Sequence, residues 1–550
     1  MARRLFSYNR FLGLDTVTSP SNMSERFLSQ LDGGYVDFRG QIIRGPVLKY
    51  ALDTNTSNYS SQKHYNIKHY GPDDYCRYIF NSNITSSVGI EIKSKSVTQS
   101  NAFIPSNAPI TPISLVNFDQ KQFSFMAGHD PYHYDGSAFT TVSGFGATQF
   151  SSLGSYPKGG MAVNILNRLV VAGIPGRETE IHVSEQDSFV NWRTNTSTGT
   201  TPNQTDGAII DVKNQFTSKD TIQGLAVLEG DKLVVFGQNE TIVYLADTNI
   251  NLWEIARDFR VPIGIFGRNT AVNVGTDVFF CSRFGVHSLK RAASGLTLET
   301  ITFTREVEDF YQSLVDSVPS GTSYNDVIFS EPHAVWDGEI GQYRVFFPQN
   351  NTGTLNREIR FTYDPNAGRS GHLSFSSSIT TGNTDADVTC GSFYARPDEG
   401  TLVSASAPPS SLLLGAMNGF GNGRVFDGTS LGNVGRNKGF FVRTPLLSQG
   451  SPDTYKHYKR LIIRAVGTCD FRVKIYDSEN NVLQNTIVRP EDDGFATTTG
   501  ISGDSTRPID LPIPHRSKSI SISFETDTDV AVNGEGTLKI LDFALIVDTK

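Results

Sequence analysis

The sequence is poor in cysteine and has no long apolar run. Its 550 residues include only four cysteines, which are widely scattered: Cys76, Cys281, Cys390 and Cys469. No two of them have the close spacing of a zinc or redox motif, so we expect isolated thiols in a protein made in a reducing cytosol. No stretch reaches the roughly 18 consecutive apolar residues of a membrane-spanning helix, so no membrane span is expected.

A secretion signal is also missing from the start of this sequence. After Met1 the residues read ARRLFSYNRFLGLD, and Asn9, Arg10 and Asp15 interrupt them. A signal peptide needs an uninterrupted apolar core of about 7 to 15 residues. We therefore expect no signal peptide here.

Charge is scarce as well. Charged residues make up 19% of the chain and hydrophobic residues 38%. Long helices and coiled coils are rich in Ala, Glu, Lys and Leu, so this composition disfavours them. The net charge of -8 excludes a generally basic protein that coats nucleic acid, although it leaves room for a local basic patch.

The chain is rich in glycine and aromatic residues, with 50 Gly, 36 Phe and 20 Tyr. Many short strands joined by Gly, Asn, Ser and Thr turns fit this composition. Short continuous apolar runs recur, and each is typical of a strand buried on both faces. These runs are NRLVVAG from Asn167, DKLVVFG from Asp231, TDVFFCS from Thr276, QYRVFFP from Gln342 and SLLLGAM from Ser411.

The spacing of these runs predicts a β-propeller. They begin 45 to 69 residues apart, which is one four-stranded blade of about 40 to 50 residues plus variable loops. We therefore place a propeller at residues 61–448. Three runs are followed, after a short turn, by a second strand-like segment, as in a hairpin: TEIHVSE from Thr179, ETIVYLAD from Glu240 and GVHSLKR from Gly285.

One segment has a helical pattern instead. Between Arg305 and Val318 the apolar residues fall on one helical face, and Thr304 is a candidate N-cap. A single short helix inserted between blades is the simplest interpretation. The apolar residues are Val307, Phe310, Tyr311, Leu314 and Val315.

A second domain is predicted at residues 453–550. Leu446 to Tyr455 read as a Gly/Ser/Pro/Asp connector, and the strands beyond it mostly alternate, as in a two-layer sandwich. The predicted class is therefore all-β, with a β-propeller-like main domain, one inserted short helix and a C-terminal β-sandwich. Residues 1–60 are predicted to pack on or close the propeller. The sandwich strands begin at Lys459, Phe471, Lys518 and Leu538.

The segment MAGHDPYHYDG is a candidate metal site, with His129, Asp130, His133 and Asp135. Two histidines four residues apart share a metal most readily on a helix. Pro131 and the two glycines make this segment a turn. We therefore expect a loop with ordinary surface histidines.

Two further segments fail as motifs. SEQDSFVNW from Ser184 is similar to the Asp-box of sialidase-like propellers, but Asp187 stands one place too late and the Gly is absent. A strand-to-turn packing motif around Phe189 and Trp192 is expected there. DSENN from Asp477 lacks the Gly at the sixth and the Glu at the twelfth position of a calcium loop, so we expect a β-turn.

No motif indicates catalysis. The chain has no phosphate-binding Gly loop, no Gly-x-Ser-x-Gly elbow and no His-Glu-x-x-His. A glycosidase would need two carboxylates facing one substrate, and the sequence singles out no such pair among its 56 acidic residues. We predict no enzyme, and no catalytic, cofactor-binding or metal-binding residue.

Two basic stretches are candidate contacts for a nucleic-acid backbone. Solvated strand faces, or contacts with an acidic neighbouring subunit, are the favoured interpretation of both. The stretches are Arg3, Arg4 and Arg10 near the start, and Lys456, Lys459, Arg460 and Arg464 in the second domain.

The chain resembles the tail nozzle and tail hub proteins of short-tailed double-stranded DNA phages (podoviruses), which include tail tubular protein B and the packaged-DNA stabilisation hub. The resemblance covers about half of the chain. It begins at FLGLDTVTSP and its glycine-arginine turns, and continues in residues 167–192 and 230–291. The Asn/Ser/Thr-rich insertions near Asn55 and Thr194 match nothing in the family.

The resemblance implies a structural virion protein, made in the host cytoplasm, that forms a hexameric ring in the phage tail. The ring would bind an upstream adaptor or tail-tube ring, and also tail fibres or spikes. Its lumen would retain and then conduct the genome during ejection. Two alternatives from other classes stay open: a tail-associated glycan-degrading propeller enzyme, and a receptor-binding protein.

Overall fold

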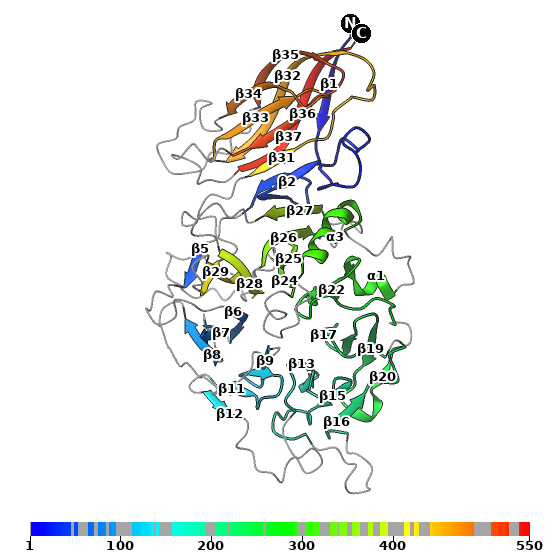
Figure 1. Ribbon diagram of the computed structural model, residues 1–550, viewed down its shortest axis with the longest axis vertical. Coiled ribbons are helices and arrows are strands. Elements are labelled where there is room, and N and C mark those ends of the chain that lie inside the picture. The colour runs from blue at the N-terminus through cyan, green and yellow to red at the C-terminus, as the bar shows by residue number, and fades with distance from the viewer. Residues whose placement is uncertain are drawn as a thin grey trace.

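The computed structural model contains a ring of small antiparallel sheets beside a two-sheet sandwich (Figure 1). It describes residues 2–45, 49–52, 64–70, 75–83, 87–94, 113–135, 139–141, 157–192, 204–217, 219–256, 260–293, 304–318, 331–338, 340–348, 355–363, 372–377, 386–393, 412–418, 423–427, 440–467, 469–488, 508–526 and 538–549. The insertions near Asn55 and Thr194 lie outside these residues.

Seven sheets form the ring, and the first four follow the chain in order. The first sheet has β6 (His64–Tyr70), β7 (Tyr75–Asn83) and β8 (Ser87–Ser94). The second has β9 (Ile113–Phe118), β10 (Lys121–Met126), β11 (Tyr132–Tyr134) and β12 (Phe139–Thr141). The third has β13 (Met161–Ile165), β14 (Arg168–Ala172), β15 (Glu180–Val183) and β16 (Ala208–Asp211). The fourth has β17 (Gly224–Leu228), β18 (Lys232–Phe236), β19 (Thr241–Leu245) and β20 (Glu254–Ile255).

Three more sheets complete the ring. The fifth has β21 (Val272–Val274), β22 (Asp277–Ser282) and β23 (Gly285–Ser288). The sixth has β24 (His333–Asp337), β25 (Gln342–Pro348), β26 (Leu355–Thr362) and β27 (His372–Ser377). The seventh joins β28 (Ala386–Phe393), β29 (Leu412–Asn418) and β30 (Gly423–Asp427) to a strand from the start of the chain, β5 (Lys49–Leu52).

The ring is closed. The first strands of successive sheets contact one another from β6 through β9, β13, β17, β21 and β24 to β28, and β28 contacts β6 again. The seventh sheet is completed by β5, which pairs with β30 in antiparallel register. Such a ring of antiparallel sheets is a β-propeller, and the early strand closes it.

The continuous apolar runs in the sequence are the second strands of these sheets. β14, β18, β22, β25 and β29 hold the five predicted runs, and every residue of β14 is buried. A second strand is flanked by strands of its own sheet and covered on both faces by neighbouring sheets, so it has no solvent-facing side. The predicted propeller with its repeated hairpins is confirmed.

The sandwich has two sheets. One has the order β3 (Gly34–Val36), β4 (Ile42–Arg44), β37 (Leu538–Thr549), β32 (Lys456–Gly467) and β35 (Ile509–Ser517), and β1 (Ala2–Tyr8) also pairs with β37. The other has the order β2 (Gln30–Asp32), β31 (Phe441–Arg443), β36 (Ser521–Glu525), β33 (Phe471–Tyr476) and β34 (Val482–Val488). The predicted C-terminal sandwich is confirmed.

The domain limits differ from those predicted. The segment 1–60 divides, because β1 to β4 are sandwich strands while β5 belongs to the propeller. The chain returns to the sandwich between Asp427 and Phe441, before the predicted connector. The physical reason is strand pairing. β1 pairs with the edge of β37 and β31 pairs with the edge of β36, so the backbone groups at both edges find hydrogen-bond partners.

The predicted helix is α3 (Glu308–Ser317), which follows the 3₁₀ turn η6 (Arg305–Val307). Thr304 occupies the N-cap, but its side chain makes no capping hydrogen bond. The described residues also contain the short helical elements α1 (Leu289–Ala293) and η4 (Ile250–Leu252). Among the described residues, every helix is too short or too polar to cross a membrane.

One apolar core joins the propeller to the sandwich. It contains Phe543 and Ile475 of the sandwich, and also Tyr343 of β25, Phe279 of β22 and Leu314 of α3. In Figure 1 the sandwich lies directly beyond β27 and α3. Because the two units share one apolar core, we expect little relative motion between them.

The first strand should contribute strongly to stability through Tyr8. This side chain is buried and its ring stacks on Phe543 at 4.8 Å. We expect Tyr8→Ala to lower the free energy of unfolding by about 3 kcal/mol or more, as for other large buried side chains. The control is Leu5→Ala on the same strand, where Leu5 is 62% exposed, and a change within about 0.5 kcal/mol is expected. Chemical denaturation measures both, and equal effects would contradict the role of Tyr8.

Candidate functional site

Four ionisable side chains lie buried together in the sheet of β24 to β27. We call Asp337, Arg344, Glu358 and Arg360 the junction network. Glu358 accepts from Arg344 Nε at 2.5 Å and from Arg360 Nη2 at 3.0 Å. Asp337 Oδ2 lies 3.8 Å from Arg344 Nη1. All four side chains are closed to solvent.

The junction network lies where the propeller meets the sandwich. The Arg360 guanidinium is 6.0 Å from the ring centroid of Tyr35 on β3. Thr362 Oγ1 donates to the Val36 carbonyl at 2.9 Å. A Cβ added to Gly45 would lie 3.1 Å from Arg360 Nη1, so the chain beyond β4 passes directly over this arginine. The network therefore fixes the sandwich on the sixth sheet.

The charged groups of the junction network have a structural role. Burial lowers the pKa of Arg360, and Glu358 opposes this effect. Burial also acts to lower the pKa of Arg344, but Glu358 and Asp337 outweigh it and leave that pKa raised. A carboxylate held by two arginines and closed to water cannot exchange a proton with a substrate. Glu358 is thus unsuited to acid–base catalysis.

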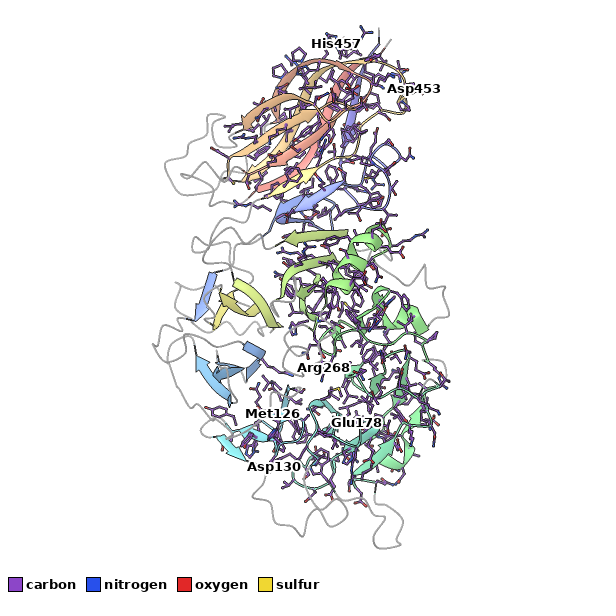
Figure 2. All side chains as sticks on the ribbon, in the orientation of Figure 1. Met126, Asp130, Glu178, Arg268, Asp453 and His457 are labelled. Atoms are coloured by element: carbon purple, nitrogen blue, oxygen red, sulfur yellow. The ribbon has the colours of Figure 1, made fainter. Side chains whose placement is uncertain are left out.

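Other carboxylates of the propeller are also committed to partners. Glu240 accepts from Thr217 Oγ1 at 2.9 Å, and Asp220 accepts from Asn239 N at 2.7 Å. Glu331 forms a two-pronged ion pair with Arg268, both bonds 2.7 Å long. Arg268 precedes β21 in the sequence and lies near the middle of the ring in Figure 2. Glu240 and Asp220 therefore tie the connection between β16 and β17 to the β18–β19 turn, and Glu331 joins the segments that lead into the fifth and sixth sheets.

A thiol and two phenols form a buried group between β22, β25 and α3. Cys281 Sγ lies 3.6 Å from Tyr343 Oη, which donates to the Thr270 carbonyl at 2.6 Å. Tyr311 Oη donates to the Ser282 carbonyl at 2.6 Å. Burial raises the pKa of Cys281 to about 12. Since the thiolate is the nucleophile, this cysteine is not reactive at neutral pH.

The candidate segment MAGHDPYHYDG forms the β10–β11 turn and β11. Asp130 pairs with Lys158 at 3.1 Å, and Figure 2 places Asp130 on the lower part of the ring. The prediction of ordinary surface histidines is wrong for His133. This residue is buried in β11, 5.5 Å from the ring of Phe123 and 5.4 Å from that of Phe189. Burial, more than Lys158, lowers the pKa of His129.

The two failed motifs have the structural roles expected of them. Trp192 is fully buried and its Nε1 donates to the Phe189 carbonyl at 3.1 Å, so the segment from Ser184 is a packing motif. Asp477 Oδ1 accepts from Glu479 N at 2.9 Å and Asn481 N at 2.8 Å in the turn between β33 and β34. Within the described ranges no group of three His, Cys, Asp or Glu residues is arranged to hold a metal ion.

The basic side chains of the second stretch pair with other groups of the sandwich. Arg460 pairs with Asp510 at 2.7 Å and Lys459 with Asp548 at 3.7 Å, and Arg464 pairs with Asp542. Lys456 is buried, and its Nζ donates to the carbonyls of Thr454 at 3.0 Å and Lys518 at 2.8 Å. These cations meet acids and carbonyls of their own chain. In the first stretch, Arg3 pairs with Asp548 at 3.4 Å.

Sequence reasoning missed Arg168, an arginine inside a strand of the propeller. It is fully buried, and its two Nη atoms donate to five carbonyls: Ser184, Thr205, Asp206, Gln204 and Thr248. These carbonyls come from loops after β15 and β19, so Arg168 joins the third sheet to the fourth. The only signal was a charged residue inside an apolar run, NRLVVAG.

Comparisons with known proteins show only distant likeness. No protein-family model and no curated protein sequence matches the chain. Among solved structures, the exo-beta-1,3-galactanase of Phanerochaete chrysosporium is 10% identical and covers 92% of this chain and 99% of its own, with a TM-score of 0.26. YCF48 from Cyanidioschyzon merolae is 10% identical and covers 69% of this chain and 98% of its own, with a TM-score of 0.33. At these scores the likeness carries no argument about what this chain does.

Removing Glu358 should destabilise the protein strongly. Glu358→Gln leaves Arg344 and Arg360 buried without their shared carboxylate, so we expect a loss of about 3 to 5 kcal/mol. The matched control is Asp510→Asn, which breaks the exposed pair with Arg460 and should cost less than about 1 kcal/mol. Urea unfolding compares the two, and a small effect of Glu358→Gln would refute the junction role.

Cys281 should resist alkylation in the native protein. We expect iodoacetamide at about pH 8 to leave it unmodified, and to label it in urea, as read by peptide mapping. The folded pKa of about 12 lies above the ordinary 9.0, so the folded state holds the thiol proton more tightly. The resulting stabilisation is complete below pH 9 and is lost as the pH rises toward 12. Fast native labelling of Cys281 at pH 8 would contradict this assignment.

Proposed function

We propose that this chain is a structural virion protein that forms the tail nozzle or hub ring of a short-tailed phage, and that it catalyses no reaction. In this proposal a hexamer of the chain retains the packaged genome and then conducts it during ejection. The ring binds an upstream adaptor or tail-tube ring, and it also carries tail fibres or spikes. The protein is made in the host cytoplasm and ends in the phage tail.

The observation that supports this proposal best is the single core shared by propeller and sandwich. A ring that must stay aligned under a packaged genome needs subunits without internal hinges. Here the apolar core and the junction network hold the two units together. A rigid block of this kind can repeat around an axis through heterologous contacts that close a ring.

A second line of support is the use of the acidic residues. Asp337, Glu358, Glu240 and Asp220 are buried and engaged within the chain, so they do not supply the open carboxylate pair of a glycosidase. The net charge of -8 also suits a DNA conduit, because a basic lumen would hold the phosphates and slow ejection. A strongly positive lumen in the assembled ring would contradict the charge argument.

The test is to determine the assembly of the purified protein and its place in the virion. We expect native mass spectrometry to give a homohexamer, and negative-stain imaging of phage carrying a tagged chain to place sixfold rings at the tail tip. No release of reducing sugar from host surface glycans is expected.

Three results would contradict the proposal. One is a trimer that releases saccharides, which supports the glycan-degrading alternative. Another is a tagged chain found away from the tail. The last is a monomer that binds host cells through its sandwich, which supports a receptor-binding protein. If saccharide is released, the Glu331→Gln variant tests whether this activity depends on the carboxylate paired with Arg268, with Asp510→Asn as the control.

A further inference from the structure

Three arginines and a phenylalanine gather on the surface of the N-terminal segment. We call Arg10, Arg26, Phe38 and Arg39 the arginine patch. All four residues are exposed, and Phe38 is 55% exposed. The Arg39 guanidinium lies 5.2 Å from the centroid of the Phe38 ring.

Backbone contacts hold the members of the patch side by side. Phe11 N donates to the Gly40 carbonyl at 2.8 Å. This bond holds the segment around Arg10 against the Phe38–Gly40 turn. A Cβ on Gly40 would lie 2.4 Å from the Arg10 Cα, and Gly40 has a φ of +76°, so only glycine fits there. Arg26 Nη2 donates to the Arg10 carbonyl at 3.2 Å. The patch is thus preorganised.

Two acids of the same segment, Asp37 and Asp15, bond to backbone amides rather than to these arginine side chains. Asp37 Oδ1 accepts from Arg39 N at 2.9 Å and Gln41 N at 2.8 Å, and Asp15 Oδ1 accepts from Thr18 N at 2.9 Å. Both acids are buried. In the described ranges none of the three patch arginines has a carboxylate within ion-pair distance.

The backbone at Arg10 has a positive φ. Its φ is +56°, a conformation that glycine and asparagine adopt far more readily than arginine. Nine other non-glycine residues of the described ranges, such as Leu166 and Lys219, also have a positive φ, so this conformation does not by itself mark a functional site. The Arg10 side chain is exposed.

We propose that the arginine patch is a docking site for an acidic segment of a different protein, one that also carries an apolar side chain to cover Phe38. Arginine and aromatic side chains dominate the central contacts of protein interfaces. Nucleic acid fits less well, because three arginines would neutralise at most three phosphates and leave Phe38 without a role. The inference does not depend on the phage proposal.

The test is binding of a synthetic peptide in which glutamate and phenylalanine alternate, followed by fluorescence anisotropy. We expect it to bind at least about tenfold more tightly than the same peptide with lysine in place of glutamate. Arg10→Asn combined with Arg39→Ser should weaken binding by about tenfold or more, and Phe38→Ser should weaken it without changing the salt dependence. Asn tolerates the positive φ, so the unfolding temperature of Arg10→Asn should not fall.

The matched control is a second arginine–aromatic pair on the sandwich. Arg516 lies 5.4 Å from the ring of Tyr455, which is 52% exposed. Arg516→Ser with Tyr455→Ser removes the same kinds of group and should leave peptide binding unchanged. The proposal fails if this control loses as much binding, if the acidic peptide does not bind, or if a DNA duplex binds more tightly than the peptide. It fails equally if the patch variants dissociate a self-association of the wild type, since the occupant would then be a second copy.

Discussion

The structure depends on satisfying sheet edges with strands from opposite ends of the chain. β1 pairs with β37 over its whole length, and β5 pairs with β30 to close the propeller. An unpaired edge leaves backbone groups without partners and invites association with other chains. Neither unit can therefore be completed before most of the chain exists. Contacts of such long sequence separation make folding slow.

Local pattern predicted much of the fold. The apolar runs gave the second strand of five sheets, alternation gave β32, β33, β36 and β37, and helical spacing gave α3. The strands β1 to β4 were missed because their partners lie hundreds of residues away, and no local signal carries that information. β35 was also missed. It contains Pro512 and Pro514, and an edge strand tolerates proline because its outer side needs no N–H donor.

The site was harder to foresee for the same reason. Asp337, Arg344 and Glu358 come from three strands and meet only after the sixth sheet forms. Arg168 finds five carbonyls on loops that the sequence does not relate to it. Residues chosen for their chemistry, such as His133, proved to be packing residues, because an imidazole in a short strand between aromatic rings is enclosed by them. The side chains that this protein presents to partners therefore lie on its surface.

The pairing of the first and last strands has a consequence for engineering. Ala2 stands opposite Thr549 in the β1–β37 ladder, and Figure 1 shows both ends of the chain side by side at the pole of the sandwich. A short peptide joining them would give a circular permutant whose new ends could open in any exposed connection. A fluorescent protein fused at either end of this chain would mark the same pole and leave the opposite face of the propeller unobstructed.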